Sequence, residues 1–175
     1  AVALLPEQNV GLYIAVNSEE GEMVRGLLYE LLDHYLGHPR ANWPEKFDAF
    51  KTRSLATAAQ QVQSAGAERA KIGPSLPIAR YAGDYNDPWY GTIAIRQEGG
   101  KLTIDFPHSP GMKAVLRHWQ YDTFVTDFTE KGLEPAFVTF GLDADGKVDR
   151  ITMKAISPIA DFSWDYHDLL FTPEK

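Results

Sequence analysis

Residues 80–106 read RYAGDYNDPWYGTIAIRQEGGKLTIDF, and this stretch decides the fold. Apolar or aromatic residues alternate with polar ones over short segments, which is typical of half-buried β-strands. The segments are separated by NDP at 86–88 and by EGGK at 98–101, two combinations that favour tight turns. The stretch therefore predicts antiparallel strands joined by hairpins.

The same pattern continues to the end of the sequence. Turn combinations recur at spacings of roughly ten residues, with SPG at 109–111, KG at 131–132 and DADG at 143–146. Such spacing predicts an all-β barrel or sandwich, and closure into a barrel would remove the exposed edges of a short sheet. We expect about eight strands, near residues 79–85, 89–97, 101–107, 113–119, 122–129, 134–142, 147–156 and 160–171.

The composition excludes several classes of function. The 175 residues carry a formal net charge of −7, which disfavours nucleic acid as a partner because phosphate binding needs a basic face. The absence of cysteine rules out disulfides and thiolate sites. No apolar run approaches the ~20 residues of a membrane span, so we expect none.

The first 37 residues predict a β-hairpin and a helix. Alternating apolar residues flank PEQN at 6–9, and a wide apolar stripe at helical spacing follows. Asn17 and Ser18 are the expected caps of this helix and Gly37 its end. A second helix is expected over residues 44–66, with Pro44 in its first turn. Two strands and one helix cannot bury a core alone, so this part should pack on something larger.

A family resemblance supports that expectation. LLPEQNVGLYIAVNS at residues 4–18 resembles the strand-turn-strand near the C-terminal end of the serine beta-lactamase-like hydrolase domain. That superfamily includes penicillin-binding proteins, class C beta-lactamases and D-aminopeptidases. The resemblance implies that residues 1–37 are a C-terminal remnant of such an α/β domain, with its front part missing from this chain.

A second resemblance covers the rest of the chain. Its motifs are Tyr81-x-Gly83-x-Tyr85, Tyr90-Gly91, His118-Trp119-x-Tyr121-Asp122-x-Phe124 and Asp143-x-Asp145-Gly146. In this order they resemble the DUF3471-type domain that follows many beta-lactamase-like hydrolase domains. The resemblance implies an antiparallel, lipocalin-like barrel over residues 76–175, joined to the remnant by a helical linker over 38–75. It also implies a periplasmic or extracellular location.

The catalytic motifs of the resembled hydrolases are absent. Those enzymes activate a serine with a lysine three residues later, and none of the seven serines here has a lysine at that position. No tyrosine is followed by asparagine two residues on, and neither Lys-Thr-Gly nor His-x-Gly occurs. We therefore expect no catalytic residue in this chain alone, whereas its parent protein would be a serine hydrolase.

Metal and cofactor sites are not predicted either. The acidic run at 143–149 places its glycine fourth, whereas an EF-hand loop needs glycine sixth and glutamate twelfth. A hairpin turn explains this run better. His34 and His38 are four residues apart, but Gly37 between them marks a helix end.

The densest polar-aromatic cluster is HWQYD at 118–122. Strand alternation would point His118, Gln120 and Asp122 to one side and the two aromatic residues between them to the other. The functional interpretation is a ligand site; the alternative is that one set fills the barrel and the other packs beneath the linker helix. The candidate ligand-binding residues are His118, Trp119, Tyr121 and Asp122, with Trp89 and Tyr90 as further candidates.

The sequence favours two functions over a third possibility, that the chain is itself an enzyme of unknown chemistry. The first is a non-catalytic accessory domain of a beta-lactamase-related serine hydrolase, which shapes the active site or mediates association. The alternative is a stand-alone, lipocalin-like module that binds a small molecule. The expected partners are the catalytic domain or a second copy of the chain, which would form a homodimer through residues 1–36.

Overall fold

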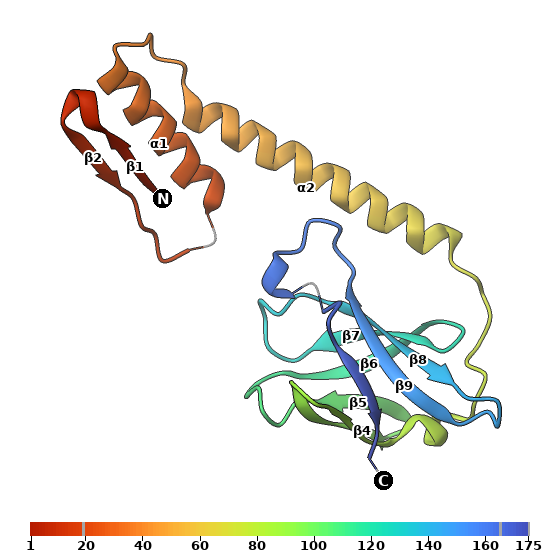
Figure 1. Cartoon of the computed structure of the whole chain (residues 1–175). Coiled ribbons are helices and arrows are strands. Elements are labelled where there is room, and N and C mark those ends of the chain that lie inside the picture. The colour runs from red at the N-terminus through yellow and green to blue at the C-terminus, as the bar shows by residue number, and fades with distance from the viewer. Residues whose placement is uncertain (19, 165, 175) are drawn as a thin grey trace. The chain divides into compact units, whose positions relative to one another are not determined.

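The computed structural model describes residues 1–18, 20–164 and 166–174 (Figure 1). The chain divides into two compact units, Ala1–Ala58 and Ala59–Lys175. The first unit holds strands β1 (Val2–Leu5) and β2 (Val10–Tyr13), helix α1 (Gly21–Leu36) and the start of helix α2 (Trp43–Glu68). The second unit holds the end of α2 and all the remaining strands.

The hairpin of the first unit is confirmed. A short 3₁₀ turn, η1 (Pro6–Gln8), joins β1 to β2, and Asn9 closes it in the left-handed region with φ of 55°. The register pairs Val2 with Tyr13 and Leu5 with Val10. Because side chains alternate across a strand, Val2, Leu4 and Tyr13 share one face, and that face is exposed.

The caps predicted for the first helix are wrong at one end and right at the other. Helix α1 begins at Gly21 after Glu20, not after Asn17 or Ser18, and no side chain caps it. The Glu20 carboxylate instead pairs with Lys51 Nζ on α2 at 2.6 Å. At the other end Gly37 adopts a φ of 72°, and the next amide, that of His38, donates to the Asp33 carbonyl at 2.8 Å.

The second unit is a closed barrel of eight antiparallel strands. The strands are β3 (Gly83–Asp87), β4 (Gly91–Glu98), β5 (Lys101–Asp105), β6 (Lys113–Gln120), β7 (Thr123–Phe128), β8 (Ala136–Leu142), β9 (Val148–Ala155) and β10 (Leu170–Pro173). Each strand pairs with its neighbour in sequence, and β10 pairs with both β9 and β3 to close the ring. The spacing of the sequence allowed a barrel or a sandwich, and the structure is the barrel.

Alternate side chains fill the barrel interior. Ile151 lies opposite Phe140 on one side and Phe171 on the other, and all three side chains are buried. The rings of Tyr81, Phe124 and Phe140 contact one another edge to face, with centroids 4.9–5.6 Å apart. A barrel of eight strands is narrow enough for its own side chains to fill.

Two predicted strands differ from the structure. At the start of 79–85 the chain forms a 3₁₀ turn, η2 (Ile78–Tyr81), which brings the fully buried Tyr81 ring into the barrel interior, and the strand begins only at Gly83. Within 160–171 only the last two residues belong to β10, and Phe162–Trp164 form a 3₁₀ turn, η3. Residue 165 of that predicted strand lies outside the described residues.

Barrel closure can be tested at β10. Phe171 is fully buried and Leu170 beside it is 48% exposed. We expect Phe171→Ala to lower the free energy of unfolding by about 3–5 kcal/mol, because it leaves a cavity where the ring contacts the core. Leu170→Ala should change it by less than about 1 kcal/mol. Urea unfolding of the two variants measures both, and equal losses would contradict a core role for Phe171.

Candidate functional site

The six predicted ligand residues lie at opposite ends of the barrel. His118 to Asp122 surround the β6–β7 turn, whereas Trp89 and Tyr90 lie in the loop between β3 and β4. In an up-and-down barrel these two connections are at opposite ends, because an odd number of strands separates them. The structure therefore brings the candidates into two groups and not one.

The strict alternation expected for 118–122 is interrupted by a bulge. The pairing of β6 with β7 shifts between His118 and Gln120, and Tyr121 adopts a φ of 47°. The His118 Nε2 atom lies 2.8 Å from the Tyr121 carbonyl oxygen across this turn. Bulge and turn redirect the side chains that a regular strand would have placed on two faces.

Asp122 ties the segment before the barrel to this turn. Its carboxylate accepts hydrogen bonds from the Ser75 amide at 2.9 Å, the Ser75 hydroxyl at 2.8 Å and the Tyr81 hydroxyl. Burial alone would raise the pKa of Asp122, but these donors outweigh it and hold the pKa below its usual value. Burial and the bond to Asp122 raise the pKa of Tyr81 to about 12.

The neighbouring candidates also contact the segment that precedes the barrel. Trp119 packs edge to face on Phe137, and the Arg69 guanidinium lies over its ring at 4.9 Å. The Ala70 amide donates to the Gln120 side chain at 2.7 Å. The contacts of this end fasten residues 69–81 to the barrel, and a ligand site here stays a prediction.

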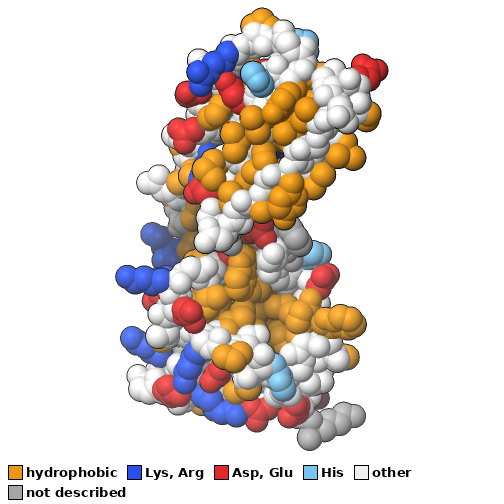
Figure 2. Space-filling model, turned by 90° about the vertical axis from the view of Figure 1, so that its left-hand side faces the viewer, with side chains coloured by type: hydrophobic (Ala, Val, Ile, Leu, Met, Phe, Trp, Pro, Cys, Tyr) orange, Lys and Arg blue, Asp and Glu red, His pale blue; other side chains and the backbone are white. Residues whose placement is uncertain are grey.

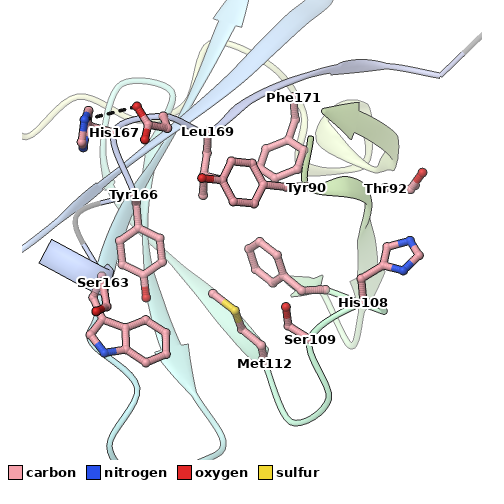
Figure 3. Close-up of a pocket in the computed structure, with 13 residues that line it drawn as sticks. Tyr90, Thr92, His108, Ser109, Met112, Ser163, Tyr166, His167, Leu169 and Phe171 are labelled. Atoms are coloured by element: carbon pink, nitrogen blue, oxygen red, sulfur yellow. Dashed lines mark ion pairs between the residues drawn. The ribbon is translucent and has the colours of Figure 1, made fainter. Parts of the chain in front are cut away.

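The opposite end of the barrel holds a pocket of about 530 Å³ (Figure 3). Its apolar and aromatic lining comes from Tyr90, Phe106, Met112, Trp164, Tyr166, Leu169 and Phe171. Its polar lining comes from Thr92, His108, Ser109, Ser163, His167 and Asp168. Three loops build it: β3–β4, β5–β6 and β9–β10.

The floor of the pocket belongs to the barrel core. The Phe106 and Phe171 rings meet edge to face, with centroids 6.2 Å apart, and both are buried. Tyr90, Tyr166 and Met112 turn toward the same space from different loops (Figure 3). The Tyr166 hydroxyl donates to the Glu134 carbonyl at 2.8 Å, and burial raises the pKa of this phenol. Part of the pocket wall is therefore anchored, by burial of the two floor rings and by the hydrogen bond of Tyr166.

Gly91 allows the rim to approach the barrel closely. It has a φ of 77°, and a Cβ atom there would lie 2.7 Å from the His108 ring. Such a distance is shorter than any ordinary carbon–carbon contact, so only glycine lets His108 lie against the start of β4.

Asp87 fixes the two loops that flank the pocket. It is the only buried charged side chain among the described residues. Its Oδ1 accepts from the amides of Trp89 at 2.8 Å and Tyr90 at 2.9 Å, and its Oδ2 accepts from the Leu170 amide at 3.0 Å. Burial would raise the pKa of Asp87, but the three amides outweigh that effect and lower it.

Only one of the six predicted ligand residues lines this pocket. Tyr90 does, with 45% of its surface exposed, whereas the adjacent Trp89 is 87% exposed and outside it. The other lining residues were not singled out from the sequence. The aromatic-rich run FSWDYHDLLF at 162–171 was a usable signal, but its alternation suggested a strand and not a pocket wall.

A second hollow, of about 580 Å³, lies along β7 and the loop to β8. Its lining is rich in charged side chains of both signs, with Arg117, Asp127, Glu130, Lys131 and Glu134 among them. Ligand pockets are mostly apolar with a few polar groups. The pocket at the barrel mouth meets that description better and is the candidate site.

Two further observations concern metal ions and membranes. Within the described residues no group of three or more histidine or acidic side chains is placed to hold a metal ion. Neither α1 nor α2, as far as their residues are described, is long and apolar enough to cross a membrane.

The second unit matches a known protein family. A family model described as "Domain of unknown function (DUF3471)" matches residues 67–173, which comprise the barrel and the segment that leads into it. No curated protein matches the chain.

The role of Asp87 can be tested with Asp87→Asn. Asparagine carries an NH₂ group in place of one carboxylate oxygen, and this group would face backbone amides that are themselves donors. We therefore expect a loss of about 1–3 kcal/mol in the free energy of unfolding at pH 7. Because the folded-state pKa lies below the usual 3.8, the carboxylate stabilises the fold above pH 3.8, and this stabilisation disappears as the pH falls through the folded value.

Urea unfolding at several pH values measures the difference between wild type and variant. The difference in the free energy of unfolding should become smaller below pH 3.8, where Asp87 of the wild type gains a proton. Asp145→Asn, at an exposed turn residue, is the matched control and should change the free energy by less than about 0.5 kcal/mol. A difference independent of pH would contradict the ionised carboxylate.

Proposed function

We propose, from the premise that the chain belongs to the DUF3471 family, that it is a non-catalytic accessory part of a beta-lactamase-related serine hydrolase. The barrel would shape the active site of the hydrolase or mediate its association. Residues 1–37 would complete the catalytic domain, which their resemblance to its C-terminal hairpin and helix supports.

The observation that carries this proposal is the exposed apolar face of the first unit. Val2, Leu4 and Tyr13 on the hairpin are 66%, 73% and 78% exposed. On α1, Met23 and Leu27 are 50% and 44% exposed. Figure 2 shows hydrophobic side chains gathered on one face of this unit.

The first unit has almost no core of its own. Among its described residues only Gly26 and Ala58 are buried. Gly26 is shielded because α1 approaches the start of α2, where a Cβ would lie 2.8 Å from Pro44. Burial of apolar area contributes about 25 cal/mol per Å². A large apolar partner surface would therefore stabilise this unit strongly, as the sheet of a hydrolase domain would.

A second candidate function is supported by a different observation. The pocket at the barrel mouth has the size and the apolar lining of a small-molecule site. It favours a binding module of lipocalin-like type, although the site would lie at the mouth and not in the filled interior. This function is compatible with an accessory role, because the same barrel can bind a ligand while attached to a hydrolase.

The accessory role predicts the effect of charge on the apolar face. We expect Leu4→Glu/Leu27→Glu to weaken binding to the hydrolase domain at least about tenfold, because two carboxylates would be buried without partners. Gln8→Glu/Asn17→Glu adds the same charge at exposed polar positions of the same unit and should leave binding within about twofold. The domain to use is the one encoded in the reading frame that contains this chain, and sedimentation of the mixture measures binding.

Two outcomes would contradict the accessory role. One is a reading frame that encodes no Ser-x-x-Lys motif before Ala1. The other is a homodimer that forms through residues 1–36 and that Leu4→Glu/Leu27→Glu dissociates, because the apolar face would then belong to a second copy of the chain.

A further inference from the structure

We propose that the pocket at the barrel mouth binds an aromatic or branched apolar group carried by an uncharged or cationic ligand, and that it discriminates against anions. The inference deepens the second candidate function and rests on it, while it is independent of the accessory role. It assigns a ligand class to a site that the sequence did not predict as a unit.

The size and lining of the pocket argue for a ring-sized apolar group. Its volume of about 530 Å³ falls within the ordinary range for small-molecule sites. Its floor is formed by buried side chains, Phe106, Leu169 and Phe171, with Met112 beside them. Binding of an apolar group above such a floor is favourable, because it removes the apolar surface of both from water.

The charges around the pocket argue against an anionic ligand. No lysine or arginine is among the described residues that line it, so a bound carboxylate would exchange its hydration for histidine and hydroxyl groups alone. Asp168 contributes a carboxylate to the lining and lies 3.2 Å from His167 Nε2. The net charge of −7 also attracts cations to the protein as a whole.

The aromatic lining provides a favourable surface for a cation. Tyr90, Trp164 and Tyr166 contribute rings from two separate loops, and a cation over such a face is attracted by its quadrupole. The hydroxyls of Ser109 and Ser163 add groups that can accept a hydrogen bond from an ammonium or a hydroxyl. An uncharged ligand keeps the apolar contacts and one such bond, so it should also bind.

Three probes of similar size separate these contributions: phenethylamine, 2-phenylethanol and phenylacetate. They share a phenyl ring and differ in carrying a cationic, a neutral and an anionic group. We expect dissociation constants of about 1 mM for the first two. The dissociation constant for phenylacetate should be at least about tenfold larger, because no lysine or arginine lines the pocket and the Asp168 carboxylate would repel it.

The three methionines of the chain provide a site-specific readout. Met112 lines the pocket, Met153 is buried in the barrel core and Met23 is half exposed on α1. In the whole chain labelled with ¹³C at the methionine methyl groups, a bound ring should shift the Met112 signal and leave the Met23 signal unchanged. A shift at Met23 alone would place the probe on the apolar face of the first unit and overturn the proposal.

Adjacent aromatic residues supply the matched variants. Tyr90→Ala removes a ring that lines the pocket and should weaken the binding of phenethylamine at least about fivefold. Trp89→Ala removes the neighbouring exposed ring and should leave binding within about twofold. Ser109→Trp fills the mouth from an exposed position and should abolish the Met112 shift.

The outcomes distinguish this inference from the function on which it rests. Phenylacetate that shifts Met112 at least as strongly as phenethylamine would overturn the ligand class but keep a binding module. Binding that is equal in Tyr90→Ala and Trp89→Ala would overturn the site. No shift at Met112 with any of the probes would reject both the inference and the binding module, and would leave the accessory role intact.

Discussion

The buried carboxylate of Asp87 is the constraint on which the open end of the barrel depends. It accepts hydrogen bonds from amides of the turn after β3 and from the amide of Leu170, the first residue of β10, which lies 83 residues from Asp87 in sequence. Those segments are the two sides of the seam that closes the barrel, and each also carries part of the pocket wall. A neutral side chain could not accept all three amides equally well, since charged acceptors make the stronger hydrogen bonds. Closure of the barrel and the arrangement of the pocket loops therefore depend on the same side chain, Asp87.

The two ends of the barrel differ in construction. At one end Tyr81 enters the interior, and its hydroxyl, together with Ser75, is held by Asp122, so that the segment before the barrel seals it. At the other end the loops stand apart around a floor of core rings. The interior between them is filled by alternating side chains. A ligand bound at the mouth would therefore lie on a filled core and not inside the barrel.

Much of the barrel could be predicted from the sequence because its signals are local. Period-two alternation and Gly-containing turns located β4 to β9 within a few residues. The signals failed where the chain serves a distant contact: the predicted strand at 79–85 starts as a turn because Tyr81 plugs the barrel, and most of 160–171 is a loop because it forms the pocket wall. The pocket itself was not predicted, because Phe106, Met112 and Phe171 look like core residues until the loops are placed. The sequence around Asp87 indicates a turn, but its hydrogen bond from the distant Leu170 amide could be found only in the structure.

The closing seam also has a consequence for how the protein is made. Thr172 pairs with Asn86 across 86 residues, so the barrel cannot close until β10 has left the ribosome. Until then β3 to β9 can form only an open sheet with an unpaired strand at each edge, and such edges readily pair with other chains. Pairing over so long a separation is also slow, because the chain loses loop entropy before the contact forms. This nascent barrel therefore passes through an aggregation-prone stage that ends only when β10 pairs.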